Sequence, residues 1–210
     1  PNALCVSGTH GKTTTSSMCA HIFLAADADP TVMIGGTLPL LHAGYRVGQG
    51  DTIILESCEY CNSFLSFYPT VAVILNVEED HLDFFKDLAD IQHSFRRFAE
   101  LVPAAGAVVV NADNAAAMEA VAGLDRSVLT FGLDHPADCT AANLREEDGF
   151  PVFDVVIRGK VYAHAALRVH GHHNVLNALA ALAAADAVGA DAACAAESLG
   201  RFENVHRRFE

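Results

Sequence analysis

NALCVSGTHGKT, residues 2–13, is the stretch from which the fold of this chain is interpreted. Asn2–Ser7 is a short apolar run, and the glycine-rich sequence GTHGKT follows at residues 8–13. Residues 13–26 have a helix-compatible composition, with Met18, Ile22 and Ala25 spaced to share one helical face. The sequence therefore predicts a strand, a glycine-rich loop and a helix in direct succession.

This succession is the context that a phosphate-binding loop requires. Glycines let backbone N–H groups come close to phosphates, and the N-terminus of a helix adds partial positive charge. In such a loop Lys12 would reach the β- and γ-phosphate oxygens, and the Thr13 hydroxyl would bind Mg²⁺. The usual pattern has a glycine five residues before Gly11, where this chain has Val6. A glycine turn followed by a chance lysine is therefore the alternative interpretation.

Apolar runs and helical patterns alternate along the residues that follow. Buried strands are predicted at residues 31–34, 52–55, 71–75, 107–111 and 127–131. Helices are predicted at residues 114–121 and at residues 87–101, where Ile91, Phe95, Phe98 and Leu101 recur at helical spacing. Continuously apolar strands suit a parallel sheet covered on both faces. The predicted fold class is α/β, a doubly wound and mostly parallel sheet of P-loop type.

The pattern changes at residue 139. Residues 139–169 alternate between polar and apolar, and the runs 153–157 and 161–169 on either side of Arg158, Gly159 and Lys160 predict an antiparallel hairpin in a small β-subsheet. From His173 the pattern is helical again, with Gly189 as the expected C-cap, and a second helix is predicted at residues 192–199. The absence of a repeat or a low-complexity linker favours one domain with a β-appendage.

Composition limits the class of protein. The 210 residues are 51% hydrophobic and 19% charged, as in a compact globular chain. A formal charge of −13 argues against a general nucleic-acid or anionic-membrane binder, although a local basic pocket stays open. No stretch approaches the roughly 20 apolar residues that cross a bilayer, and no secretory signal is visible. Six cysteines are too few for a disulfide scaffold, so reduced thiols in a cytoplasm are expected.

Acidic and histidine residues follow two of the predicted strands. Glu56 ends the strand at residues 52–55, and Asp80 and His81 lie just beyond the strand at residues 71–75. Ligands gather at the carboxyl ends of the strands in an open parallel sheet, so these groups are expected to face the phosphate loop. A carboxylate there can hold Mg²⁺ directly or through water. For His81 the alternative is a surface histidine in a polar loop.

A Cys-x-x-Cys spacing occurs at Cys58 and Cys61. It matches half a zinc knuckle or a redox pair, but no second pair with suitable spacing accompanies it. Cys5, Cys19, Cys139 and Cys194 stand singly in apolar or helical contexts.

Five blocks of the sequence resemble the central domain of the Mur ligases. They are GTHGKTTT (8–15), ESCEYCNSFL (56–65), NVEEDHLDFF (76–85), GHHNVLNALAA (171–181) and HRRFE (206–210), in family order across nearly the whole chain. His10 in the loop, the Cys-Glu-Tyr variant after Glu56 and the Arg-Arg-Phe close most resemble the alanine-adding branch of the family. Because Cys58 and Cys61 lie within one of these blocks, the resemblance implies that their Cys-x-x-Cys spacing arose incidentally, by substitution within the block.

The resemblance implies a three-domain enzyme of which this chain, residues 1–210, is the central ATP-binding domain. The N-terminal UDP-sugar domain and the C-terminal amino-acid domain would lie outside it, as the start at Pro1 and the end at Glu210 also suggest. The expected reaction joins L-alanine to UDP-N-acetylmuramate through an acyl phosphate, with ATP and Mg²⁺, in cytoplasmic peptidoglycan precursor synthesis.

The resemblance also implies roles for particular residues. Lys12 would clamp phosphate, Thr13 and Glu56 would hold one Mg²⁺, and His81 would serve a second Mg²⁺ near the γ-phosphate, so Lys12 and His81 are the expected catalytic groups. His173, Asn174 and Asn177 would line the adenine pocket, and Arg208 would lie near the nucleotide. The expected ATP-binding loop residues are Gly8, Thr9, His10, Gly11, Lys12, Thr13 and Thr14. His173 and Asn174 could equally serve as an N-cap for the alanine-rich helix.

The sequence departs from several relatives at one place where a metal ligand would be lost. Several relatives hold a metal through a carbamylated lysine on the helix that follows the Asp-His motif, whereas residues 94–97 here are Ser-Phe-Arg-Arg. An arginine stays protonated and cannot become such a ligand. The lysines of this chain are Lys12, Lys86 and Lys160, and the alanine-adding branch likewise lacks the modified lysine.

Two other functions stay open on the sequence. One is a different Mur-type amide ligase, for peptide recycling or folate polyglutamates. The other is a nucleotide-binding module that is inactive as an isolated fragment.

Overall fold

The structure is a computed structural model that describes residues 2–203. Its ten strands are β1 (Asn2–Ser7), β2 (Thr31–Leu38), β3 (Ala43–Arg46), β4 (Thr52–Glu56), β5 (Val71–Ile74), β6 (Ala107–Asn111), β7 (Ser127–Phe131), β8 (Cys139–Glu147), β9 (Phe150–Ile157) and β10 (Lys160–Ala166). The helices are α1 (Lys12–Ala25), the 3₁₀ segment η1 (Tyr60–Ser66), α2 (Leu88–Glu100), α3 (Ala115–Val121), α4 (His172–Ala187) and α5 (Ala192–Leu199).

All strands belong to one sheet in the order β10-β9-β8-β7-β6-β5-β1-β4-β2-β3. The segment from β7 to β2 is parallel, and β3 pairs antiparallel with β2 at one edge. At the other edge β8, β9 and β10 are antiparallel to one another, and β8 joins β7 only through the pair Phe131–Cys139. The α/β class, the mostly parallel sheet and the antiparallel subsheet are thus confirmed.

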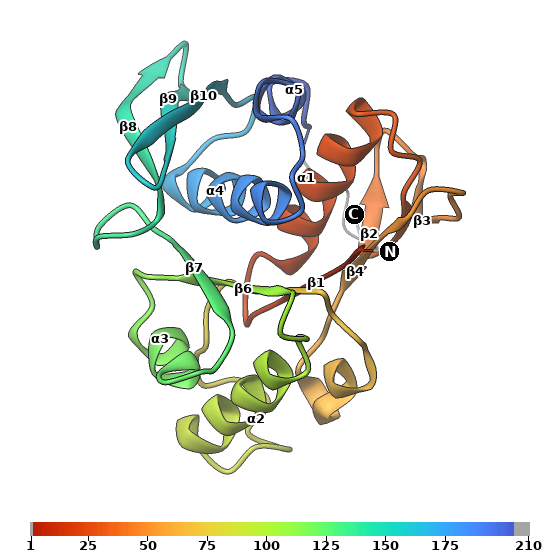
Figure 1. The fold of residues 1–210 in the computed structure, drawn as a ribbon, viewed down its shortest axis with the longest axis vertical. Coiled ribbons are helices and arrows are strands. Elements are labelled where there is room, and N and C mark those ends of the chain that lie inside the picture. Colours follow the sequence, from red (N-terminus) through yellow and green to blue (C-terminus); the bar gives the residue numbers. More distant parts are fainter. Residues whose placement is uncertain (1, 204–210) are drawn as a thin grey trace.

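Helices cover both faces of the sheet (Figure 1). On one face α1, α4 and α5 pack together, and their alanines and Met18 share a buried core with β1 and β9. On the other face η1, α2 and α3 enclose a second core, in which Phe64 stacks on Phe98 and meets Phe95 edge-on. Because strands of the parallel segment are buried on both sides, β5 consists only of buried residues.

Local sequence explains where several helices begin and end. Asp87, Asn114 and Asp191 each accept a backbone N–H three residues later, which caps α2, α3 and α5. Gly189, at φ +75°, follows the last turn of α4, as the sequence predicts. Two residues assigned to buried helical faces are exposed instead: Ala25 ends α1 and Leu101 follows α2, so both lie where the helix leaves the core.

The structure adds elements that the sequence pattern did not indicate. β2 continues past Ile34 to Leu38 and turns back through β3, where exposed Tyr45 and half-buried neighbours give no strong alternation. η1 has left-handed φ angles at Cys61 and Asn62, a conformation that period-based interpretation cannot detect. β10 ends at Ala166, three residues before the predicted end.

The order of the strands reverses at β1. The chain runs from β1 to β2 and back to β4 on one side, then crosses to β5 on the other side of β1. In open α/β sheets ligands bind at such a reversal, outside the carboxyl ends of the strands. A ligand site is therefore expected at the residues that follow β1, β4 and β5.

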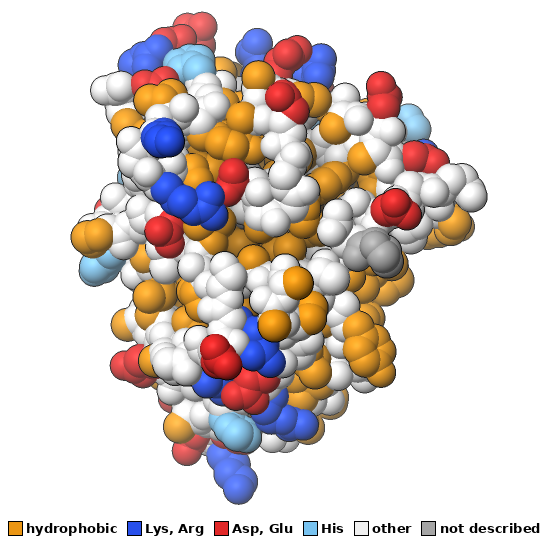
Figure 2. Space-filling view, in the orientation of Figure 1, with side chains coloured by type: hydrophobic (Ala, Val, Ile, Leu, Met, Phe, Trp, Pro, Cys, Tyr) orange, Lys and Arg blue, Asp and Glu red, His pale blue; other side chains and the backbone are white. Residues whose placement is uncertain are grey.

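The surface and the helices show two further features. Acidic and basic side chains are interspersed on the face in Figure 2, so the formal charge of −13 is not gathered into one acidic patch there. No helix among residues 2–203 combines the length and the apolar character needed to cross a membrane.

Candidate functional site

The glycine-rich loop lies between β1 and α1, as predicted, and two of its glycines are sterically required. Gly8 has φ +144°, and a Cβ there would lie 2.9 Å from Leu75 Cβ and 3.0 Å from the Asn76 backbone nitrogen. Gly11, at φ +85°, is the N-cap residue of α1, and its Cβ would lie 2.7 Å from Asn177 Oδ1. The loop is therefore pressed between the end of β5 and α4, and only glycine fits at these positions.

Asn76, which sequence interpretation did not single out, anchors the loop. Its Oδ1 accepts the His10 N–H at 2.7 Å, its Nδ2 donates to the His10 carbonyl at 3.1 Å, and its own carbonyl accepts the Thr9 N–H at 3.1 Å. The Thr9 hydroxyl accepts the Glu78 N–H at 3.1 Å. An asparagine at the end of an apolar strand was the available signal, because such a side chain has both a donor and an acceptor.

α1 starts without a side-chain cap among the described residues. The first N–H groups of a helix have no intrahelical acceptor, and together with the helix dipole they favour an anion at this end. The uncapped start of α1 therefore fits a phosphate group.

Lys12 lies across this loop. Its Nζ donates to the Gly8 carbonyl at 2.6 Å and to the Thr9 carbonyl at 3.3 Å, and it pairs with Glu59 Oε2 at 3.2 Å. Glu59 is only 2% exposed. A buried carboxylate needs a charged partner, so Glu59 and Lys12 hold each other in place at the mouth of the loop.

Thr13 meets Glu56 at the end of β4, as expected for two groups that would share a cation. The Thr13 hydroxyl donates to Glu56 Oε1 at 3.1 Å, and the Gly35 N–H donates to Glu56 Oε2 at 2.6 Å. A Cβ on Gly35 would lie 2.7 Å from Glu56 Oε1, so β2 approaches the carboxylate closely. Both oxygens of Glu56 thus accept a hydrogen bond, one from the first turn of α1 and one from β2.

His81 is grouped with Glu59 and Asp80 rather than with Glu56. Its Nε2 is 3.9 Å from Glu59 Oε1 and 3.7 Å from Asp80 Oδ2, and one ligand atom of each residue lies within 4.8 Å of the others. Two carboxylates and an imidazole are a donor set that suits a divalent cation. Sequence interpretation missed Glu59, although its place three residues after Glu56 in the same block was a usable signal.

The ring of Tyr60 lies against His81, with centroids 4.6 Å apart. The Tyr60 hydroxyl donates to Asp83 Oδ2 at 2.8 Å. This hydrogen bond and the negative charge of Asp83 raise the pKa of Tyr60 to about 12.

The start of α4 supplies the other predicted nucleotide residues. Asn174 and Asn177 are 5% and 9% exposed, and the Asn177 amide donates to Asn174 Oδ1 at 3.3 Å, directly behind Gly11. His173 is exposed. The N-cap of α4 is Gly171 without a side-chain cap, so the N-cap alternative for His173 and Asn174 is wrong, because the Asn174 amide donates back to the His170 carbonyl instead.

The remaining predicted residues are placed as follows. The side chain of His10 is 71% exposed and lies 3.7 Å from Glu78. Thr14 is half-buried in the first turn of α1, and Lys86 is exposed before α2. Arg208 lies outside the described residues.

The cysteines divide by burial. Burial raises the pKa of Cys5 to about 11 and the pKa of Cys19 and Cys139 to about 12. Cys58 and Cys61 are exposed and unbridged, and the metal-capable group found within residues 2–203 contains no cysteine.

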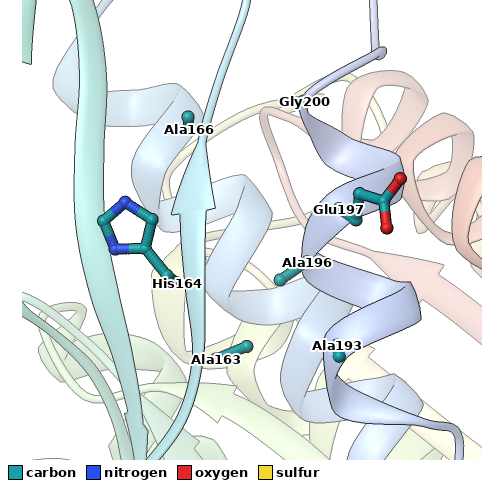
Figure 3. Close-up of a pocket in the computed structure, with 7 residues that line it drawn as sticks. All are labelled: Ala163, His164, Ala166, Ala193, Ala196, Glu197 and Gly200. Carbon is teal, nitrogen blue, oxygen red and sulfur yellow. The ribbon is translucent and has the colours of Figure 1, made fainter.

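A pocket of about 440 Å³ lies elsewhere, between β10 and α5. Figure 3 shows that alanines line it while His164 and Glu197 point away from it. His164 instead pairs with Asp154 at 2.9 Å, and Glu197 pairs with Arg201 at 3.5 Å. The pocket therefore lacks polar side chains directed at a ligand.

The loop with Lys12 and Thr13, placed where a parallel sheet reverses its strand order, defines the chain as an α/β domain of the phosphate-binding-loop class. Comparison with known proteins identifies the family more closely. Residues 6–185 match the model of the Mur ligase middle domain, and the chain belongs to the Mur ligase family.

Curated relatives include two UDP-N-acetylmuramate–L-alanine ligases. That of Clostridium novyi is 44% identical over 207 residues, and that of Caldanaerobacter subterraneus subsp. tengcongensis is 44% identical over 206 residues. The alignments cover 99% and 98% of this chain but 45% of each relative. The chain thus spans less than half the length of these relatives.

Solved structures agree with the fold. The UDP-N-acetylmuramate–alanine ligase of Thermotoga maritima has a TM-score of 0.86 at 32% identity, covering 100% of this chain and 46% of that one. A UDP-N-acetylmuramate:L-alanyl-γ-D-glutamyl-meso-diaminopimelate ligase from Neisseria meningitidis has a TM-score of 0.87 at 34% identity, covering 98% of this chain and 67% of that one.

Proposed function

We propose that this chain is the central ATP-binding domain of a longer ligase that joins L-alanine to UDP-N-acetylmuramate in the cytoplasm. A UDP-sugar domain would precede residues 1–210 and an amino-acid domain would follow them. The relatives that are 44% identical over nearly the whole chain are ligases of this name. The observation that carries the proposal is the meeting of Lys12, Glu59 and His81 beside the glycine-rich loop.

The proposed chemistry activates a carboxylate before the amide forms. The substrate carboxylate attacks the γ-phosphorus of ATP, and ADP leaves; the amine of L-alanine then displaces phosphate from the acyl phosphate. A carboxylate is a poor electrophile, and phosphorylation provides its leaving group. The task of the protein is to align two anions and to reduce their repulsion.

The residues of this chain divide that task. The loop from Gly8 to Thr14 and the first turn of α1 would bind the phosphates, and Lys12, held by Glu59, would neutralise the charge between them. Thr13 with Glu56, and His81 with Glu59 and Asp80, would hold Mg²⁺, which withdraws charge from phosphoryl oxygens when it is bound. Asn174 and Asn177 would face the adenine.

The first test replaces Lys12 in the full-length ligase. We expect Lys12→Ala to lower alanine-dependent ADP formation by about 100-fold or more, because a preorganised charge is lost from the site. Since this change also leaves buried Glu59 unpaired, thermal melting should accompany the assay, and Lys12→Arg should separate loss of charge from loss of position. Exposed Lys160→Ala is the matched control. Near-normal turnover by Lys12→Ala would contradict the proposal.

The second test asks which substrate supplies the amine, L-alanine or a preformed peptide. The similarity to the Neisseria meningitidis ligase favours one alternative, transfer of a preformed peptide. The full-length protein is assayed with UDP-N-acetylmuramate or free N-acetylmuramate as the acid, and with L-alanine, the tripeptide or glutamate as the amine. We expect ADP to form with UDP-N-acetylmuramate and L-alanine. Activity with the tripeptide alone would favour the alternative. Calorimetry of residues 1–210 with Mg-ATP would show whether the domain binds nucleotide by itself.

A further inference from the structure

His81 has an orientation that its own backbone and hydrogen bonds explain poorly. Its φ is +51°, in the left-handed region that non-glycine residues adopt infrequently. Its Nε2 is 3.7 Å from Asp80 and 3.9 Å from Glu59, beyond hydrogen-bonding distance in both cases. Hydrogen bonds to these two carboxylates therefore do not fix the rotation of the imidazole.

Tyr60 is the group in position to do so. Its ring lies against the His81 ring at 4.6 Å with an interplanar angle of 37°, so it covers one side of the imidazole. The residue before it, Glu59, is buried and paired with Lys12. The far end of Tyr60 is held by its 2.8 Å hydrogen bond to Asp83.

Asp83 and Phe84 complete this support. They follow His81 by two and three residues, and the edge of Phe84 meets the Tyr60 ring at 6.1 Å and 75°. The segment after β4 and the segment after β5 are therefore joined through Tyr60, on the two sides of β1. Residues 80–83 belong to no helix or strand, and the turn in which the His81 carbonyl accepts the Phe84 N–H at 2.9 Å and the Phe85 N–H at 3.0 Å holds the backbone rather than the imidazole.

We propose that Tyr60 is a positioning residue: its ring, fixed by Asp83, keeps His81 Nε2 directed at Glu59 and Asp80, so that a divalent cation meets three ligand atoms already in place. The inference rests on the proposed function, because it assigns a support to the same site. Groups that orient metal ligands typically change metal affinity by 10- to 100-fold when they are removed.

The test measures Mn²⁺ affinity of the full-length ligase by the electron paramagnetic resonance of the free ion. We expect Tyr60→Ala to weaken binding about tenfold or more, and Tyr60→Phe, which keeps the ring and loses the Asp83 bond, to weaken it less. Tyr68→Ala is the control, because Tyr68 is 87% exposed and lies before β5.

A double-mutant comparison separates positioning from general stability. If Tyr60 acts through His81, then Tyr60→Ala should have almost no further effect on Mn²⁺ affinity once His81 is changed to Ala. An equal loss in both backgrounds, or unchanged affinity in Tyr60→Ala, would overturn the inference. Because Tyr60→Phe retains the packing, it keeps the test valid if the alanine variant does not fold.

The outcomes also separate this inference from the proposed function. Wild-type protein that ligates L-alanine while Tyr60→Ala binds Mn²⁺ normally would refute the role of Tyr60 alone. Wild-type protein that neither binds Mn²⁺ nor ligates L-alanine would refute both.

Discussion

Lys12 and Glu59 are the two residues on which the candidate site depends most. Each is the charged partner of the other, and Glu59 is almost fully buried. Removing one partner of such a pair typically costs about 3–5 kcal/mol, because the remaining charge is left without compensation. The same pairing brings the carboxylate next to His81, so one ion pair links the phosphate loop to the metal-capable group.

Gly8 allows a prediction at the scale of one residue. We expect Gly8→Ala to abolish Mg-ATP binding in calorimetry and to destabilise the protein by more than about 2 kcal/mol, because φ is positive there and the Cβ meets Leu75 at 2.9 Å. Gly123→Ala is the matched control: φ is +64°, but nothing lies within 4 Å of the added Cβ. It should cost about 1–2 kcal/mol and leave binding unchanged. Equal effects of the two substitutions would contradict this account.

The N-cap residues start the helices, and one of them also holds a neighbouring segment of the chain in position. Asp87 and Asp191 each cap their own helix, whereas Asn114 does more. Its Oδ1 accepts the Ala117 N–H at 2.8 Å and also the Val77 N–H at 3.2 Å, so α3 is tied to the segment that leads to Asp80 and His81. The cap of α3 thereby supports the segment that carries the candidate metal ligands.

The caps of α3 and α5 give a prediction at the scale of the element. Asp191→Ala should lower the free energy of unfolding by about 1 kcal/mol, the usual cost of a lost N-cap. Asn114→Ala should lower it by about 2 kcal/mol or more, because buried Val77 also loses its acceptor. Urea denaturation of both variants measures the difference. A smaller loss for Asn114→Ala than for Asp191→Ala would show that the Val77 bond contributes little.

The whole molecule combines a doubly covered parallel sheet with antiparallel pieces at both edges. The site lies near the middle of the sheet, where β1, β4 and β5 adjoin. Both cores enclose these strands, so Lys12 at the start of α1, Glu56 at the end of β4 and Asn76 after β5 adjoin the best-packed part of the fold. The edge strand β10 lies far from it in the strand order, whereas the other edge strand, β3, is separated from β4 only by β2.

Amide hydrogen exchange followed by mass spectrometry tests this distribution of stability. Peptides from β1 and β5 should exchange more than about tenfold more slowly than peptides from β3, because local opening costs least at an exposed edge and most in the core. The comparison needs no substitution. Exchange in β3 as slow as in β5 would show that opening is global rather than local.

Much of the fold was predictable because it depends on neighbouring residues. Apolar runs of strand length, helical spacing and capping residues located β1, β6, β7 and α5 to the residue and most other elements closely. The glycine-rich loop and its lysine were equally predictable, since a strand, a glycine turn and a helix in succession carry the signal themselves. The resemblance to the Mur ligases, which rested on five blocks in family order across nearly the whole chain, is confirmed by the family match.

The sequence alone therefore determined the class of fold, the family and the position of the glycine-rich loop, all of which follow from residues close together in the chain. Tertiary structure decided which distant groups meet: Glu59 with Lys12, Tyr60 with His81, Asn76 with His10 and Asn177 with Gly11. The physical reason is that these contacts cross between loops separated by strands and helices. Their geometry depends on strand order and on left-handed turns at Cys61, Asn62 and His81, neither of which has a periodic pattern in the sequence.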